Sequence, residues 1–198
     1  MKTASSTFTR LGLPLLTLLL IPTFAHAHGG TGSASGFSHG FGHPLGGLDH
    51  LCAMIAVGLW AAQMGGRAIW AVPLTFVGVM TLGGIAGMAG LSFPFVEQGI
   101  VLSVLLLGVL IAAAVRLPLA ASVVIVGLFA LFHGHAHGTE MPGNSSALGY
   151  AAGFILATAL LHSIGIGVGI ALQKMTKPIL VRFAGVALVL CACWLWIG

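Results

Sequence analysis

Two short clusters of histidines and acidic residues have the chemistry to hold a metal ion. Their members are His43, Asp49 and His50 in the first cluster, and His133, His137 and Glu140 in the second. Imidazole nitrogens suit nickel, cobalt, copper and zinc, whereas magnesium and calcium prefer oxygen ligands. The two clusters therefore predict a site for a divalent transition metal ion.

The first cluster requires a break in the helix before one ion can reach all of its members. In a continuous helix, His43 and His50 share a face but stand about 10 Å apart along the axis. The chain between them is not expected to be regular helix, because it contains Pro44, Gly46 and Gly47. Such a break would let His43 fold back toward Asp49 and His50. The alternative is a capping arrangement in which Asp49 bonds to a neighbouring histidine.

The second cluster has helical spacing. His133 and His137 are four residues apart, which places two imidazoles on one helix face and within reach of one ion. His135 points elsewhere if the helix persists, and the sequence does not decide whether it binds metal. Glu140 lies two turns beyond His133. The alternative for this segment is a solvated, histidine-rich loop that binds metals only opportunistically.

Two more histidines are candidates outside these clusters. His162 lies within an apolar run, about 22 Å from the start of that run near residue 147 at 1.5 Å per residue, so it is a candidate relay for an ion moving inward. The alternative for His162 is a purely structural role. His28 becomes the first residue if the chain is cleaved after Ala27, and its α-amine and imidazole could then chelate nickel or copper.

Membrane helices must position these residues. The chain is 58% hydrophobic and 5% charged, with a mean hydropathy of +1.11, whereas soluble domains carry roughly a quarter charged residues. The few basic residues are scattered singly and form no stripe, which excludes nucleic acid as a partner. The sequence predicts an all-α polytopic membrane protein in contact with lipid.

Three regions follow along the chain. Residues 1–27 have a positive start, an apolar stretch and a small-x-small site, as in a cleaved signal peptide, although an uncleaved first helix is the alternative. Residues 28–42 are rich in Gly, Ser and His and predict a flexible periplasmic arm. Residues 43–198 predict a bundle of six transmembrane helices, whose apolar runs are 46–64, 68–91, 99–115, 119–132, 147–172 and 179–197. The fourth run is short and is expected to continue into the histidine-rich segment.

The charges predict an orientation. A cleaved signal places the mature N-terminus outside, and six crossings then return the C-terminus to the same side. In this arrangement every basic residue of the mature chain lies on the inner side, namely Arg67, Arg116, Lys174, Lys177 and Arg182. Glu97 and Glu140 lie outside. We therefore expect a protein of the bacterial inner membrane with both termini in the periplasm.

Pairs of glycines recur at helical spacing inside the apolar runs. Gly83 and Gly87 form one such pair, and Gly165 and Gly169 form another. Small residues one turn apart let helices approach closely in lipid. The alternative is that the glycines near Gly165 loosen the fifth helix, which would then form part of a permeation path.

At its two clusters the sequence resembles the HupE/UreJ family of bacterial nickel and cobalt permeases. Members of that family carry a His-x5-Asp-His motif and a Phe-His-Gly-x-Ala-His-Gly-x-Glu motif, and both occur here, starting at His43 and Phe132. The resemblance covers nearly the whole chain. It implies import of Ni²⁺ or Co²⁺ for the maturation of hydrogenase, urease or cobalamin, with His43, Asp49, His50, His133, His137 and Glu140 as the functional positions. His135 occupies a variable position of the motif.

The expected function is therefore secondary, ATP-independent import of Ni²⁺ or Co²⁺, with no permanently bound cofactor and no enzymatic activity. A doubly charged ion moving inward gains about 4.6 kcal/mol per 100 mV of membrane potential. The alternative is an intramembrane zinc-dependent hydrolase, in which three histidines and an aspartate hold zinc and activate water. The sequence does not decide between nickel and cobalt, or whether the chain forms a homo-oligomer.

Overall fold

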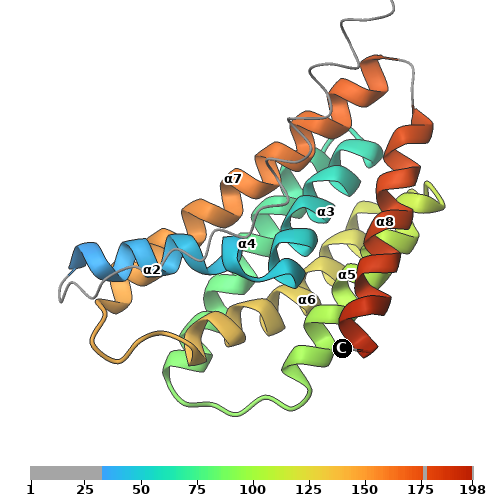
Figure 1. The fold of residues 1–198 in the computed structure, drawn as a ribbon. Coiled ribbons are helices and arrows are strands. Elements are labelled where there is room, and N and C mark those ends of the chain that lie inside the picture. Colours follow the sequence, from blue (N-terminus) through green and yellow to red (C-terminus); the bar gives the residue numbers. More distant parts are fainter. Residues whose placement is uncertain (1–32, 176–177, 198) are drawn as a thin grey trace, which may run out of the picture.

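The computed structural model describes residues 33–175 and 178–197, and all regular structure in these residues is helical (Figure 1). The helices are α2 (Ser33–Gly46), α3 (Leu48–Met64), α4 (Ala68–Met88), α5 (Val96–Ala112), α6 (Leu119–Thr139), α7 (Ala147–Lys174) and α8 (Pro178–Ile197). The predicted signal peptide, residues 1–27, and His28 lie outside the described residues. The helical class is as predicted.

Four helices are long and apolar enough to cross a membrane: α4, α6, α7 and the Ile179–Ile197 part of α8. The α2 and α3 helices qualify together as a fifth span, but the chain bends by 81° between them. The apolar α5 is shorter, with 17 residues. The chain is thus a multi-pass membrane protein with four or five candidate spans among the described residues. Each of the six predicted runs contains a helix, and α6 does continue into the histidine-rich segment, as expected.

Within the arm predicted at residues 28–42, the residues from Ser33 onward belong to the helix α2, which continues to Gly46. A Gly-rich helix has low intrinsic stability, so packing must hold it. Here α2 lies along α7 (Figure 1), and a Cβ added at Gly40 would meet the backbone carbonyl of Tyr150. On α2 itself, Phe37 and Phe41 stack with ring centroids 6.0 Å apart. The small residues that suggested an arm are contact points for a neighbouring helix.

The α4 and α6 helices meet backbone to backbone. A Cβ at Gly83 would meet the carbonyl oxygen of Leu131, and a Cβ at Gly134 would meet the carbonyl oxygen of Met80. These contacts confirm that the first predicted glycine pair serves close helix packing.

The α3 and α7 helices cross in the same way, at Gly58 and Gly165. A Cβ at Gly58 would meet the carbonyl oxygen of His162, and one at Gly165 would meet that of Ile55. Because α7 is one continuous helix over Ala147–Lys174, the alternative of a loosened fifth span is wrong.

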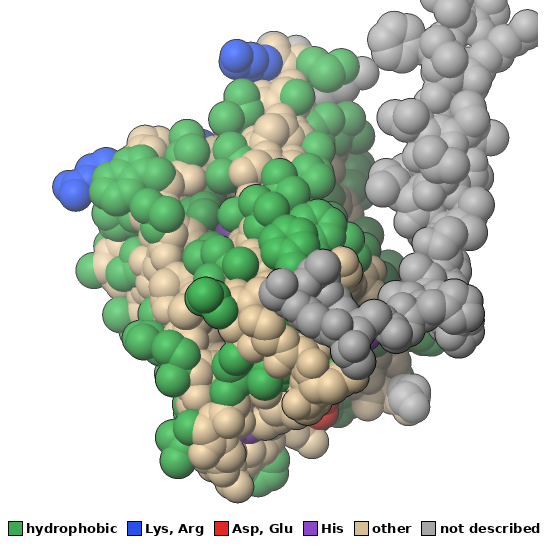
Figure 2. All heavy atoms as spheres, turned by 90° about the vertical axis from the view of Figure 1, so that its left-hand side faces the viewer, with side chains coloured by type: hydrophobic (Ala, Val, Ile, Leu, Met, Phe, Trp, Pro, Cys, Tyr) green, Lys and Arg blue, Asp and Glu red, His purple; other side chains and the backbone are tan. Residues whose placement is uncertain are grey.

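Basic and acidic side chains occupy opposite ends of the bundle. Arg116 and Arg182 line a cavity of about 110 Å³ near the start of α8, whereas Asp49 and Glu97 line a cavity of about 360 Å³ near its end. Figure 2 shows the same polarity on one face, where blue basic groups lie in the upper part and a red acidic group lies near the bottom of a largely green surface. Such polarity is typical of a protein with one defined orientation in the membrane.

The α4–α6 crossing can be tested with two glycines of α6. Gly134→Ala should destabilise the protein by about 1–3 kcal/mol, because the new methyl group overlaps the Met80 carbonyl. Gly127→Ala is the matched control, since a Cβ there meets Thr75 Cγ2 at an ordinary 3.6 Å. Thermal unfolding in detergent measures both variants. A Gly134→Ala protein as stable as Gly127→Ala would contradict the close crossing.

Candidate metal site

Three histidines from three helices converge at the acidic end of the bundle. They are His43 of α2, His50 of α3 and His137 of α6, and each offers a ring nitrogen within 4.8 Å of the other two. Two nitrogens on one tetrahedral ion stand about 3.4 Å apart. Side-chain movements on the order of 1 Å would therefore let all three bind one ion. We call these three histidines the mouth site.

The mouth site joins the two clusters that the sequence predicted. The ring centroids of His43 and His137 are 4.7 Å apart, and those of His50 and His137 are 4.9 Å apart. His43 and His50 face each other edge to face at 5.8 Å. One residue from the second cluster thus stands against two from the first, as a shared site requires.

The bend at Gly47 is what brings His43 back to His50. Gly47 is extended, with φ −95° and ψ 121°, and it separates α2 from α3. A Cβ at this position would meet Asp49 Oδ1 at 2.7 Å and His50 Nδ1 at 3.3 Å, so the corner favours glycine. The predicted break is confirmed at this residue. The chain before it, however, is helical rather than irregular.

Asp49 holds His50 through two hydrogen bonds. Its Oδ1 accepts from the backbone N–H of His50 at 2.7 Å and lies 2.9 Å from Nδ1 of the same residue. A carboxylate only accepts, so Nδ1 carries the proton and Nε2 keeps its lone pair. That Nε2 is buried and has no hydrogen-bond partner. The Asp49–histidine bond of the predicted alternative is thus present, whereas the residue that caps α3 is Gly47 and no side chain caps it. With Nδ1 bonded to Asp49, His50 can offer Nε2 to a metal ion.

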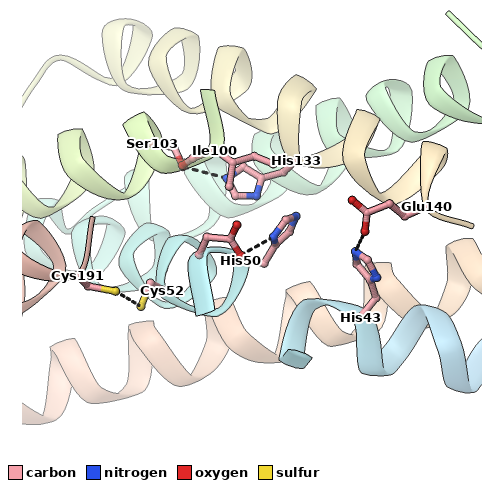
Figure 3. A network of polar contacts seen from close by, with 9 residues as sticks. His43, His50, Cys52, Ile100, Ser103, His133, Glu140 and Cys191 are labelled. Atoms are coloured by element: carbon pink, nitrogen blue, oxygen red, sulfur yellow. Dashed lines mark hydrogen bonds and ion pairs between the residues drawn. The ribbon is translucent and has the colours of Figure 1, made fainter. Parts of the chain in front are cut away.

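Glu140 and His43 form the outer edge of the site. Glu140 Oε2 lies 3.1 Å from His43 Nε2, and the Glu140 side chain is half exposed. Figure 3 shows this pair beside His50, with the rings of His43 and His50 directed into the same region. Glu140 thus adds a negative charge to the neighbourhood of the three imidazoles.

His137 is the most completely buried member of the mouth site. Its side chain is 0% exposed, neither ring nitrogen has a hydrogen-bond partner, and the ring stacks on Phe154 at 5.0 Å. An unsatisfied buried polar group costs about 1–3 kcal/mol. A bound ion would remove part of that cost.

His133 lies beside the mouth site, with its ring centroid 4.8 Å from that of His50. Its Nε2 is 2.9 Å from Ser103 Oγ, and Ser103 Oγ itself donates to the Ile100 carbonyl at 2.6 Å (Figure 3). The hydroxyl proton is thereby used, so the hydroxyl oxygen accepts from the His133 ring and leaves Nδ1 unprotonated. Ser103 was not among the predicted site residues. A lone hydroxyl in an apolar membrane helix is the signal that could have identified it.

Two predicted histidines lie away from the mouth site. His162 is buried, with Nδ1 2.8 Å from the Met54 carbonyl. His135 points to the other side of α6, where its Nε2 donates to the Leu91 carbonyl at 2.6 Å and its ring stacks on Phe93 at 4.5 Å. The structure therefore favours a structural role for His135.

Comparison with known proteins gives one family. The family model described as HupE / UreJ protein matches residues 16–195. Protein HupE of Rhizobium leguminosarum bv. viciae is 45% identical over 183 residues, which cover 92% of this chain and 95% of that protein. No solved structure matches the chain. The matched residues include the whole mouth site.

The orienting role of Asp49 can be measured by metal binding. Asp49→Asn should weaken Co²⁺ or Ni²⁺ binding by about 10- to 100-fold, because a neutral amide fixes the His50 ring less firmly and lowers its basicity. Calorimetric titration of the purified protein gives the affinity. His135→Gln is the control, since its amide can still donate to Leu91 while Nδ1 is removed. Equal losses in both variants would contradict the assignment.

Proposed function

Because the chain belongs to the HupE/UreJ family of membrane proteins, we propose that it imports Ni²⁺ or Co²⁺ across the bacterial inner membrane without ATP. The observation that carries this proposal is the convergence of three imidazoles, with ring nitrogens within 4.8 Å of one another, at one end of the bundle. Three nitrogen donors with two carboxylates beside them suit late first-row divalent ions and disfavour magnesium and calcium.

The acidic end provides access for a cation. Asp49 and Glu97 line the same cavity of about 360 Å³, together with Gln98, Val101, Leu195 and Trp196. Asp49 also contacts His50 of the mouth site. A cation attracted by the two carboxylates would therefore arrive directly beside a histidine ligand.

The acidic end faces the periplasm in this proposal. Arg67, Arg116 and Arg182 lie at the opposite end, where the positive-inside rule places the cytoplasm. Exposed tryptophans mark both interfaces: Trp70 contacts Arg67, and Trp196 lines the cavity of Asp49. The membrane potential then drives a divalent cation inward.

We further propose that six helices, α3 to α8, cross the membrane, with α2 at the periplasmic side. The 17-residue helices α3 and α5 are about 25 Å long, at the lower limit for a span. Cleavage of residues 1–27 would give α2 its periplasmic start and would make His28 an additional ligand ahead of the mouth site. The six membrane crossings and the cleavage are both part of this proposal.

Transport is favoured over an intramembrane zinc hydrolase by what lies beyond the mouth site. A hydrolase needs one closed ligand set with a position for water. Here two more buried imidazoles, His133 and His162, follow deeper in the bundle and each has an unpartnered nitrogen. A series of sites suits a moving ion better than a fixed one.

Uptake into proteoliposomes tests the function. With an inside-negative potential, the wild type should accumulate radiolabelled Ni²⁺ or Co²⁺, and collapsing the potential should stop accumulation. His50→Asn should reduce the initial rate at least about tenfold, because the Asn amide can replace Nδ1–H but offers no counterpart of Nε2. His135→Gln should transport normally. Wild-type vesicles that show no metal uptake, or that hydrolyse lipid or peptide instead, would refute the proposal.

Labelling from outside the cell tests the orientation. In a variant with Cys52, Cys191 and Cys193 replaced by serine, a single cysteine at Asn144 should react with a membrane-impermeant maleimide in intact spheroplasts. A single cysteine at Ala113 should react only after the membrane is opened. Both positions are exposed in the structure. The reverse labelling pattern would place the mouth site in the cytoplasm.

A further inference from the structure

We propose that His133 and His162 form a second, inner position for the ion, which receives it from the mouth site. This inference rests on the proposed function and specifies where the ion goes after capture. It assigns a role to His162, which contributes nothing to the mouth site, and to the ring nitrogen of His133 that Ser103 leaves free.

In each of these imidazoles one ring nitrogen makes a hydrogen bond and the other has no partner. His133 uses Nε2 for Ser103, and His162 uses Nδ1 to donate to the Met54 carbonyl at 2.8 Å. The remaining nitrogens, His133 Nδ1 and His162 Nε2, have no partner, and the residues are 0% and 2% exposed. Both nitrogens are therefore neutral acceptors in a dry environment, which is the form that binds a transition metal.

The two imidazoles continue the line of the mouth site into the bundle. His133 lies one turn, about 6 Å, deeper along α6 than His137, and Met54 lies one turn deeper along α3 than His50. The His133 ring contacts that of His50, and the Phe76 ring contacts both His133 and His162, at centroid distances of 5.5 and 5.1 Å. Ring contacts thus connect the mouth site to His162 by way of His133 and Phe76.

An unpartnered nitrogen alone does not define a site. His135 also has one, at Nδ1, but its ring lies against Phe93 and away from the mouth site. His133 and His162 differ from it because ring contacts connect them to the mouth site. Phe76 offers no ligand atom. The free nitrogens of His133 and His162 must therefore replace the water that a passing ion loses.

The chemistry of this inner position suits transit. Two neutral nitrogens can replace part of the hydration shell of a late first-row divalent ion, but they do not complete a tetrahedral set. Such incomplete ligation binds weakly enough for the ion to leave again. Magnesium and calcium, which need oxygen ligands, would be disfavoured at this point.

Two substitutions remove the free nitrogens and keep the hydrogen bonds that hold the rings. The amide nitrogen of asparagine is as many bonds from Cα as Nδ1, so His162→Asn can still donate to the Met54 carbonyl. The amide nitrogen of glutamine matches Nε2 in the same way, so His133→Gln can still donate to Ser103. Either variant separates the loss of a ligand from the loss of a packing contact.

The experiment combines Co²⁺ binding to the purified full chain, by equilibrium dialysis, with uptake into proteoliposomes. We expect the wild type to bind two ions, and His162→Asn to bind one with unchanged affinity at the mouth site. Uptake by His162→Asn and by His133→Gln should fall at least about tenfold. His135→Gln serves again as the control for a buried histidine outside the path.

The outcomes separate the inner position from the function as a whole. If His162→Asn takes up Co²⁺ as fast as the wild type and still binds two ions, the inner position is overturned and the proposed function stands. Loss of both ions in His162→Asn would overturn it too, because His162 would then belong to a single site. If the wild type takes up no metal, the proposed function is refuted. In that case, two ions bound to the wild type and one bound to each variant would still support the inner position.

Discussion

Direct contact between helix backbones at glycines is the constraint on which the arrangement of histidines depends. In lipid no hydrophobic force drives helices together, so close van der Waals packing must hold them. The α2 helix meets α7 at Gly40, α3 meets α7 at Gly58, and α6 meets α4 at Gly134. These three contacts fix the helices that carry His43, His50 and His137. A side chain at any of them would separate two helices and shift the ring nitrogens relative to one another.

A common pattern governs the imidazoles that these helices bring together. His50, His133 and His162 are held at one nitrogen by a carboxylate, a hydroxyl and a backbone carbonyl, respectively. Each partner fixes both the ring orientation and the tautomer, and the opposite nitrogen is left unpartnered. The protein thereby presents neutral ring nitrogens that can bind a metal ion, and it does so without burying a carboxylate beside each imidazole. In the part of the chain that the structure describes, carboxylates contact imidazoles directly at the mouth site, where Asp49 meets His50 and Glu140 meets His43.

The sequence predicted the parts of this structure that depend on local spacing. Apolar runs located the helices α3 to α8, the four-residue spacing placed His133 and His137 on one face, and glycines signalled the corner at Gly47. It did not predict the helix α2, because Gly and Ser residues have low helix propensity and the contacts that hold them lie on α7. The Ser103–His133 bond and the His43–Glu140 pair join distant segments, so no local pattern reveals them. Residues that face one another across helices require the tertiary structure.

The corner at Gly47 has a mechanical consequence for the mouth site. His43 and His50 come from the two arms of this corner, whereas His137 comes from a helix far along the chain. An ion held by all three would act as a temporary cross-link between the corner and α6. It would restrain the acidic end of the bundle for as long as it stays, so the lifetime of the metal–nitrogen bonds would set how quickly that end can admit the next ion.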